Sequence, residues 1–289
     1  MDLGIGVALV CAVLTQLGFL CKHRGANNVP AVELRRPLGS AGSLLRSRWF
    51  ALGMLVAAGA WLLHIIALAL APLSTVQAVL ATGVVLVAVL GDRIFGCAVS
   101  RRQWIGIAMT TVGLIALVAT LPAPETQRAT FTLPGMIAFE AVALALGALL
   151  IGAPRMGTPV RHHGALLGGA AGVLFGVGDV SLKALTGIAA GGPLAVLASP
   201  WLLVAIVAAA LAFLASARGF QQGDAVPVIA CTTTAANVTC IVGGIVVFGD
   251  ALAGGVLLFV ELAAFGLVAG AALLIPAGHG RPAPVGAAA

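Results

Sequence analysis

The sequence predicts an all-α polytopic membrane protein with nine transmembrane helices. Of its 289 residues, 61% are hydrophobic and only 8% are charged, and the mean hydropathy is +1.14. A soluble domain has close to half apolar residues and about a quarter charged ones. The five cysteines form no C-x-x-C pair and most lie in apolar runs. They are therefore interpreted as small buried residues rather than metal ligands or disulfide partners.

Nine segments have the length and composition of a membrane helix, which needs about 20 mostly apolar residues. Prolines stand near several segment ends, where helices often begin or stop. The first segment has no basic stretch ahead of it, so we expect a retained span rather than a signal peptide. The predicted spans are 3–21, 49–71, 73–91, 103–121, 133–153, 164–185, 199–217, 226–248 and 254–275.

Lys and Arg gather in alternate loops between these spans. Thirteen of the 15 lie on one side, and only Arg128 and Lys183 lie on the other. The positive-inside rule assigns the basic side to the cytoplasm. The predicted topology therefore has its N-terminus outside and its C-terminus in the cytoplasm. The same bias explains the isoelectric point of about 9.7 without a nucleic acid partner.

Short matches recur in the same order in the two ends of the chain. A Gly-Asp pair closes span 3 at Gly91-Asp92 and span 8 at Gly249-Asp250, a Gly-Leu pair lies in spans 4 and 9, and a lysine ends spans 1 and 6. Spans 1–4 are therefore predicted to repeat as spans 6–9, inverted because span 5 lies between them. Inverted repeats are typical of secondary transporters. The predicted units are residues 1–121, a connector at 122–163, residues 164–276 and a cytoplasmic tail at 277–289.

Four helices per half, with a Gly-acid pair closing the third, resemble the drug/metabolite transporter superfamily. Nine spans, with the segments "GFLCKHRG" (18–25), "ALAPLSTVQAVLATG" (69–83) and "SLKAL" (181–185), resemble its NIPA-like magnesium transporter branch. The resemblance covers nearly the whole chain and implies a transporter fold and Mg²⁺ as substrate. Span 2 departs from that pattern, because it carries His64 but no Gly-Glu pair.

Four ionisable residues lie within spans, where charged groups usually face a partner or a cavity. Glu140, Asp179, Glu261 and His64 each stand six or seven residues from the outer end of their span, roughly 10 Å deep. This common depth predicts a cation or proton site in the outward half. Each residue also has a structural interpretation, as a packing or hydrogen-bonded group.

Asp179 and Lys183 are spaced i, i+4, with the acid first, which favours an ion pair within the helix. We expect a gated ion pair that breaks when a cation or proton reaches Asp179. The alternative is a static clip at the helix end. Nearby, Gly164, Gly168, Gly172 and Gly176 form a four-residue ladder that predicts close approach of another backbone.

Span 8 carries a polar stripe that includes Thr233 and Asn237 at helical spacing. Span 3 offers Gln77 and span 1 offers Gln16. Hydroxyl and amide groups coordinate cations or hydrogen-bond solutes, and they also join helices to one another. Both interpretations stay open for these four residues.

The chain contains neither a phosphate-binding loop nor a clustered catalytic motif, so we expect no enzyme and no cofactor. The predicted function is transport of a small solute by alternating access, first a divalent cation such as Mg²⁺ held by Asp179 and Glu261. The alternatives are a proton-coupled exporter of a metabolite or drug, and a non-transporting membrane subunit. The expected partners are the lipid bilayer and the solute or cation, with a homodimer left open. The expected location is the inner membrane of a bacterium.

Overall fold

The computed structural model describes residues 2–33, 37–70, 79–80, 82–95, 99–120, 131–249 and 254–274, and every regular element within them is helical. The prediction of an all-α protein is confirmed for this part of the chain. The α-helices are α1 (Asp2–Ala26), α2 (Pro37–Arg46), α3 (Arg48–Leu70), α5 (Gly83–Phe95), α6 (Arg101–Thr120), α7 (Leu133–Gly152), α8 (Val160–Ile188), α9 (Pro193–Leu197), α10 (Pro200–Gln222), α11 (Ala225–Phe248) and α12 (Val256–Leu274). Two short 3₁₀ turns, Ala153–Met156 and Ala189–Gly191, precede α8 and α9.

Five helical segments are long and apolar enough to cross a membrane. They are Leu3–Ala26, Leu133–Met156, Val160–Ile188, Pro200–Gln222 and Ala225–Phe248. Their outward faces carry large apolar side chains, such as Leu203 and Val142, which suit lipid better than water. These segments indicate a membrane-embedded protein, whereas the count of nine spans stays a prediction.

The predicted span at 73–91 is only partly described, because residues 73–78 and 81 lie outside the described ranges. A turn at Thr82 interrupts the chain, and the described helix α5 begins only at Gly83 and continues to Phe95. Thr82 donates its backbone N–H and its hydroxyl to the carbonyl of Val79, at 3.1 and 2.6 Å. These local bonds replace the regular helical pattern at this point.

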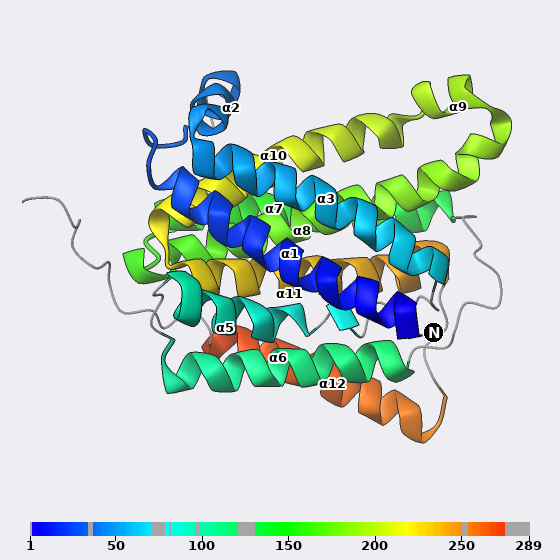
Figure 1. Cartoon of the computed structure of the whole chain (residues 1–289). Helices are drawn as coiled ribbons and strands as arrows, with labels where there is room; N and C mark the ends of the chain where they lie inside the picture. Colours follow the sequence, from blue (N-terminus) through cyan, green and yellow to red (C-terminus); the bar gives the residue numbers. More distant parts are fainter. Residues whose placement is uncertain are drawn as a thin grey trace, which may run out of the picture.

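The first span also ends later than expected. Helix α1 continues to Ala26, so Lys22 lies inside a helix rather than just beyond one. The predicted loop after it contains the short helix α2, which joins α3 with only Ser47 between them. In Figure 1 α2 stands above the beginning of α3, at the opposite end of the bundle from the N-terminus of α1.

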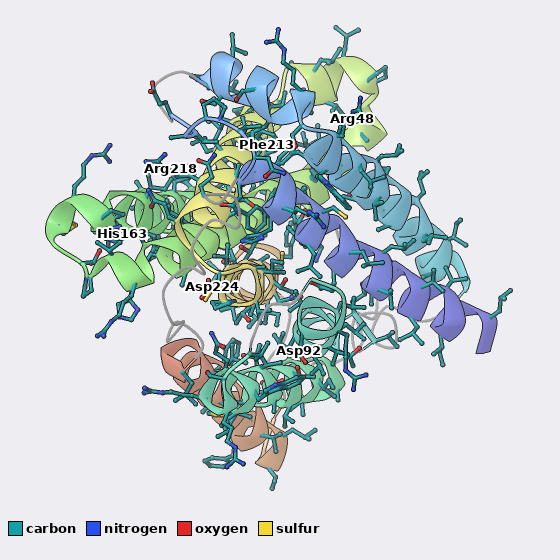
Figure 2. All side chains as sticks on the ribbon, turned by 60° about the vertical axis from the view of Figure 1, so that its left-hand side comes forward. Arg48, Asp92, His163, Phe213, Arg218 and Asp224 are labelled. Atoms are coloured by element: carbon teal, nitrogen blue, oxygen red, sulfur yellow. The ribbon has the colours of Figure 1, made fainter. Side chains whose placement is uncertain are left out.

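Helix α11 lies in the middle of the bundle. Figure 2 shows it nearly end-on, with α8, α1 and α5 around it. Helix α8 packs along α10 and α11, α1 packs along α3, and α6 packs along α12. Helix α5 touches both α1 and α11, so it links the N-terminal and C-terminal sets of helices.

A hydrophobic cluster joins the two sets at the end of the bundle where α1 finishes. Leu20 and Phe50 from α1 and α3 pack in it with Phe220 and Ile229 from α10 and α11, all of them buried. Phe19 and His23 meet the ring of Phe220 edge-on, with centroids 6.4 and 5.7 Å apart. The core is thus continuous across the two sets at this end.

Candidate functional site

The glycine ladder of α8 is the seam on which α11 rests. Methyl groups at Gly168 and Gly176 would lie 2.6 Å from the carbonyl oxygen of Val228 and 2.5 Å from Cβ of Thr239. The hydroxyl of Thr232 donates to the carbonyl of Gly168 at 3.0 Å. The close approach predicted for the ladder is confirmed, and it brings polar groups of α11 against α8.

Asp179 stands next to this seam. Its carboxylate accepts a hydrogen bond from the Cys240 thiol of α11, with sulfur and oxygen 3.7 Å apart. Asn237 and Thr233 lie one and two turns before Cys240, on the same side of α11, and both are half-buried. The structure therefore places Asp179 next to the predicted polar stripe. Its side chain is exposed on the surface of the single chain.

The amide of Asn237 also bonds within its own helix. Its Nδ2 donates to the carbonyl of Thr233 at 2.8 Å. This bond fixes the orientation of the amide on the Asp179 side of α11. A carboxylate, an amide and a hydroxyl are the kinds of group that coordinate a cation or hydrogen-bond a solute, so these adjoining helix faces are a candidate site.

Lys183 lies one turn beyond Asp179 toward the end of α8. Its Nζ is 4.1 Å from the ring centroid of Phe248, at the end of α11. A cation over an aromatic ring is an attractive contact. The gating ion pair between Asp179 and Lys183 stays a prediction.

Glu140 of α7 is buried against the opposite side of α8. Its Oε1 accepts from the hydroxyl of Ser181 at 2.7 Å, while its Oε2 is buried without a hydrogen-bond partner. Because Ser181 follows Asp179 by two residues, the two acids stand at nearly the same level of α8. A buried carboxyl with one free oxygen suits the carrying of a proton.

Glu261 is fully buried on α12, which packs against α6. The side of α12 that contains Ala264 and Val268 lies on Gly113 of α6. The described contacts therefore put Asp179 and Glu261, the two predicted metal ligands, on different helix pairs. Within the described ranges no three His, Cys, Asp or Glu side chains gather closely enough to hold a metal ion.

Gln16 of α1 lies beside the interruption of the predicted third span. A methyl group at Gly83, the first residue of α5, would be 2.7 Å from Nε2 of Gln16. The side chain is only 2% exposed, and its Oε1 is buried without a partner. Transporters often build their sites where a membrane helix is interrupted, so this position is a second candidate for a solute contact.

Two other predicted residues cannot be placed by their side chains. His64 belongs to α3, but its side chain lies outside the described part of the structure, as does the whole of Gln77. Their assignments to the site stay predictions.

Two buried threonines that the sequence did not single out lie on helix faces that also carry residues of the apolar cluster between α5, α6 and α11. Thr110 shares a face of α6 with Ile107 and Leu114, and Thr234 lies one turn after Ala230 on α11. Both hydroxyl oxygens are buried without a hydrogen-bond partner. The sequence does show a polar residue within an apolar helix face at each position. Helical spacing alone, however, does not identify which neighbouring helix packs against that face.

Polar side chains also join the two sets of helices at the Lys/Arg-rich end, in a group that we call the latch. Gln221 donates to the carbonyls of Ala26 and Pro30 at 2.9 and 3.1 Å and accepts from the N–H of Val32 at 2.8 Å. Asn27 donates to the carbonyl of Phe220 at 3.1 Å. These bonds connect residues about 190 positions apart, which is why the sequence did not reveal them.

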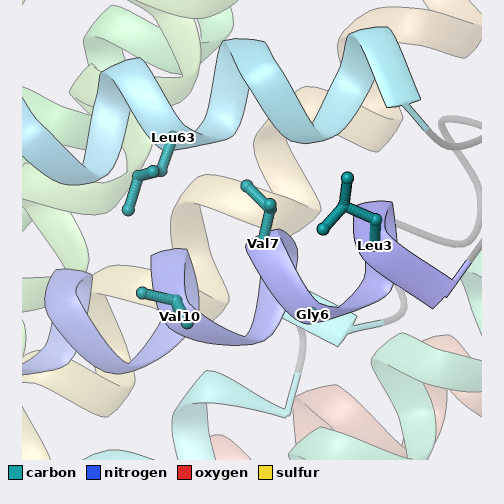
Figure 3. A pocket seen from close by; sticks show the side chains of 5 residues that line it. All are labelled: Leu3, Gly6, Val7, Val10 and Leu63. Carbon is teal, nitrogen blue, oxygen red and sulfur yellow. The ribbon is translucent and has the colours of Figure 1, made fainter.

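A shallow groove on the outer surface of α1 and α3 has a different character. Figure 3 shows its lining by Leu3, Gly6, Val7, Val10 and Leu63, and its volume is about 460 Å³. All of these side chains are apolar, so the groove offers a solute neither charge nor hydrogen bonds. Its composition suits contact with lipid chains.

Searches against protein-family models, curated proteins and solved structures gave no match. The assignment of a function therefore depends on the geometry described above.

Proposed function

We propose that the protein is a membrane transporter that moves a small solute by alternating access. The observation that carries this proposal is a matched pattern of helix packing. Helix α1 packs along α3 and touches α5, and α8 packs along α10 and α11. The two patterns follow the same order as the sequence matches, and they meet where α5 touches α11 and α6 packs along α12. Two inverted halves around a central site are typical of secondary transporters.

The proposal includes nine spans, an outside N-terminus and a place in the drug/metabolite transporter superfamily. Helix α7 is the connector between the halves, and it packs against α8. The inner membrane of a bacterium remains our proposed location. The latch closes the end that carries most of the Lys and Arg residues, so the described conformation is closed toward the cytoplasm in this topology.

A divalent cation such as Mg²⁺ is the proposed substrate. Mg²⁺ retains several of its waters and is held through one or two carboxylates, so a site does not need a cluster of acids. Asp179 supplies one carboxylate, and Asn237 and Thr233 supply neutral oxygens nearby. In this scheme the cation displaces the Cys240 thiol from Asp179.

Proton-coupled export of a metabolite or drug is the second candidate. The buried Glu140 favours it, because its Oε2 has no partner and its other oxygen is held by Ser181. Protonation would remove the charge from the membrane interior, and release of the proton would couple to movement of α7 against α8. The third hypothesis, a non-transporting subunit, predicts that the polar stripe faces outward or a protein interface rather than a central cavity. The central position of α11 does not favour it.

The test is uptake into proteoliposomes that contain a Mg²⁺-sensitive dye, with and without a pH gradient. We expect Mg²⁺ entry that Asp179→Asn abolishes without loss of folded yield, because Asp179 is exposed and its loss leaves the core intact. Glu33→Gln, an exposed acid outside the helices, is the matched control and should transport normally.

Normal transport by Asp179→Asn would remove Asp179 from the mechanism. Absence of Mg²⁺ entry with folded wild-type protein would exclude the cation proposal. Proton release on addition of candidate metabolites, lost in Glu140→Gln, would then identify the exporter.

A further inference from the structure

A polar pocket lies at the corner where α2 meets α3, close to the end of α1. Its volume is about 520 Å³, and it is lined by Asn28, Ser43, Arg46, Ser47, Arg48 and Trp49, among others. Figure 2 shows Arg48 at this corner, with its side chain at the edge of the bundle. The pocket is separate from the Asp179 site, because none of its lining residues belongs to α8 or α11.

The charge of this pocket is positive. Arg46 and Arg48 both line it and are exposed. Arg24 adds a third guanidinium beside it, because its Cζ lies 4.3 Å from the ring centroid of Trp49. The forked donors of arginine match the oxygens of a phosphate group. Ser47 and Asn28 add a hydroxyl and an amide to the lining, whereas the Ser43 hydroxyl donates to the carbonyl of Ser40 at 2.8 Å.

The surroundings of the pocket are those of a membrane surface. Helix α2 exposes Leu38 and Leu45, at 88% and 53% of their surface, beside a basic end. Such a helix suits a position in the interface of a bilayer. Trp49 marks the same level, since tryptophan is enriched at membrane interfaces. Below it the surface of α3 is apolar, with Leu52 and Leu55 exposed at 45% and 70%.

We propose that this pocket binds the phosphate of an anionic phospholipid headgroup, with the acyl chains along the exposed face of α3. A free phosphate would contact the positive charges of the pocket but not the exposed apolar surface of α3 below it. The phospholipid uses both features, and the basic side of the protein faces the leaflet that is rich in anionic lipid. The inference depends on the membrane setting and not on which solute is transported.

The test is native mass spectrometry of the full-length protein in detergent, titrated with phosphatidylglycerol or with phosphatidylcholine. We expect preferential retention of one phosphatidylglycerol. Arg46→Gln with Arg48→Gln should weaken that binding about thirtyfold, from the loss of two cationic contacts near the surface. Arg101→Gln with Arg102→Gln is the control, because these arginines are also exposed and basic but begin α6. Equal losses in both double variants would overturn the proposal.

Two further measurements test the role of the forked arginine donors and distinguish a lipid from a free phosphate. Arg46→Lys with Arg48→Lys retains the charge but loses the forked donors, so it should fold and still bind more weakly than wild type. Inorganic phosphate and glycerol 3-phosphate separate the lipid from a free phosphate. If either displaces phosphatidylglycerol at equal concentration, the pocket is a site for a soluble phosphate and the lipid proposal is wrong.

Discussion

Helices α1 and α8 open the two proposed halves, yet they use glycine against different neighbours. Gly18 of α1 faces Gly53 and Ala57 of α3. Gly168, Gly172 and Gly176 of α8 instead face α11, whereas Gly164 meets Gln222 and Gly223 at the end of α10, and both Gly164 and Gly168 approach Gly219 of α10. Helix α8 thus has close contacts on two sides, whereas the glycines of α1 lie mainly against one partner.

The contact of α8 with α11 brings polar groups of the two helices together. Close approach at the α8 ladder brings Thr232 to within hydrogen-bond distance of Gly168, and it places Cys240 beside Asp179. In the first half, α1 and α3 correspond to α8 and α10, and these two apolar helices are joined by the Cys11 thiol, which donates to the carbonyl of Ala60 at 3.1 Å. Matching positions in the two proposed halves therefore do not determine which groups their helices present to each other.

The largest expected effect comes from crowding the α8 seam. In Gly172→Ala the new methyl group would meet the carbonyl of Thr232 and Cβ of Ala235, both on α11. A backbone carbonyl and a Cβ atom cannot move aside without a shift of the helix, so we expect a loss of about 2–3 kcal/mol in the free energy of unfolding. Gly18→Ala on α1 should cost less, because its nearest contact, the carbonyl of Gly53, would be 3.1 Å away. Thermal unfolding in detergent measures both.

Gly6→Ala is the matched control for these two variants. Gly6 lies within α1 and no atom lies within 4 Å of the position of the added methyl group. The better helix propensity of alanine should stabilise it by up to about 1 kcal/mol. If Gly172→Ala were as stable as Gly6→Ala, the difference between α8 and α1 would not be one of packing.

The next effect concerns the place where both halves are joined. Gln221→Ala removes three hydrogen bonds between α10 and the segment after α1. We expect a loss of about 1–3 kcal/mol, since two carbonyls and an N–H lose their partner. Amide hydrogen exchange of residues 26–33 should also become faster. Gln222→Ala is the control, because that side chain lies beside Arg218 of its own helix. Equal exchange in the two variants would contradict the latch.

The sequence predicted much of this fold because apolar length and helical spacing are local properties. The helices and the seam of glycines follow from such patterns. The contact of Asp179 with Cys240 of the stripe does not, because spacing within each helix leaves the relative orientation of the two helices open. The turn at Thr82 was missed, because the interruption lies within an apolar run that reads as one continuous span. The latch and the bond from Ser181 to Glu140 were missed for another reason. Each joins residues far apart in the chain, and no spacing within one helix specifies the partner on another.

The smallest expected effect separates two threonines of α11 that the sequence treats alike. The Thr232 hydroxyl donates to the carbonyls of Gly168 and Val228, at 3.0 and 2.8 Å, whereas the Thr234 hydroxyl is buried without a partner. Thr232→Val should therefore cost about 0.5–1.5 kcal/mol in thermal unfolding. Thr234→Val should be neutral or slightly stabilising, since burial of an unpaired hydroxyl is unfavourable.

Transport measured on the same two variants sharpens the comparison. If Thr234 keeps its free hydroxyl for the solute, Thr234→Val should slow uptake while it leaves the protein as stable as wild type. Thr232→Val should then lose stability and keep its transport, because its hydroxyl serves the seam alone. Unchanged transport by Thr234→Val would mean that its hydroxyl has no contact with the solute and that this face of α11 only packs.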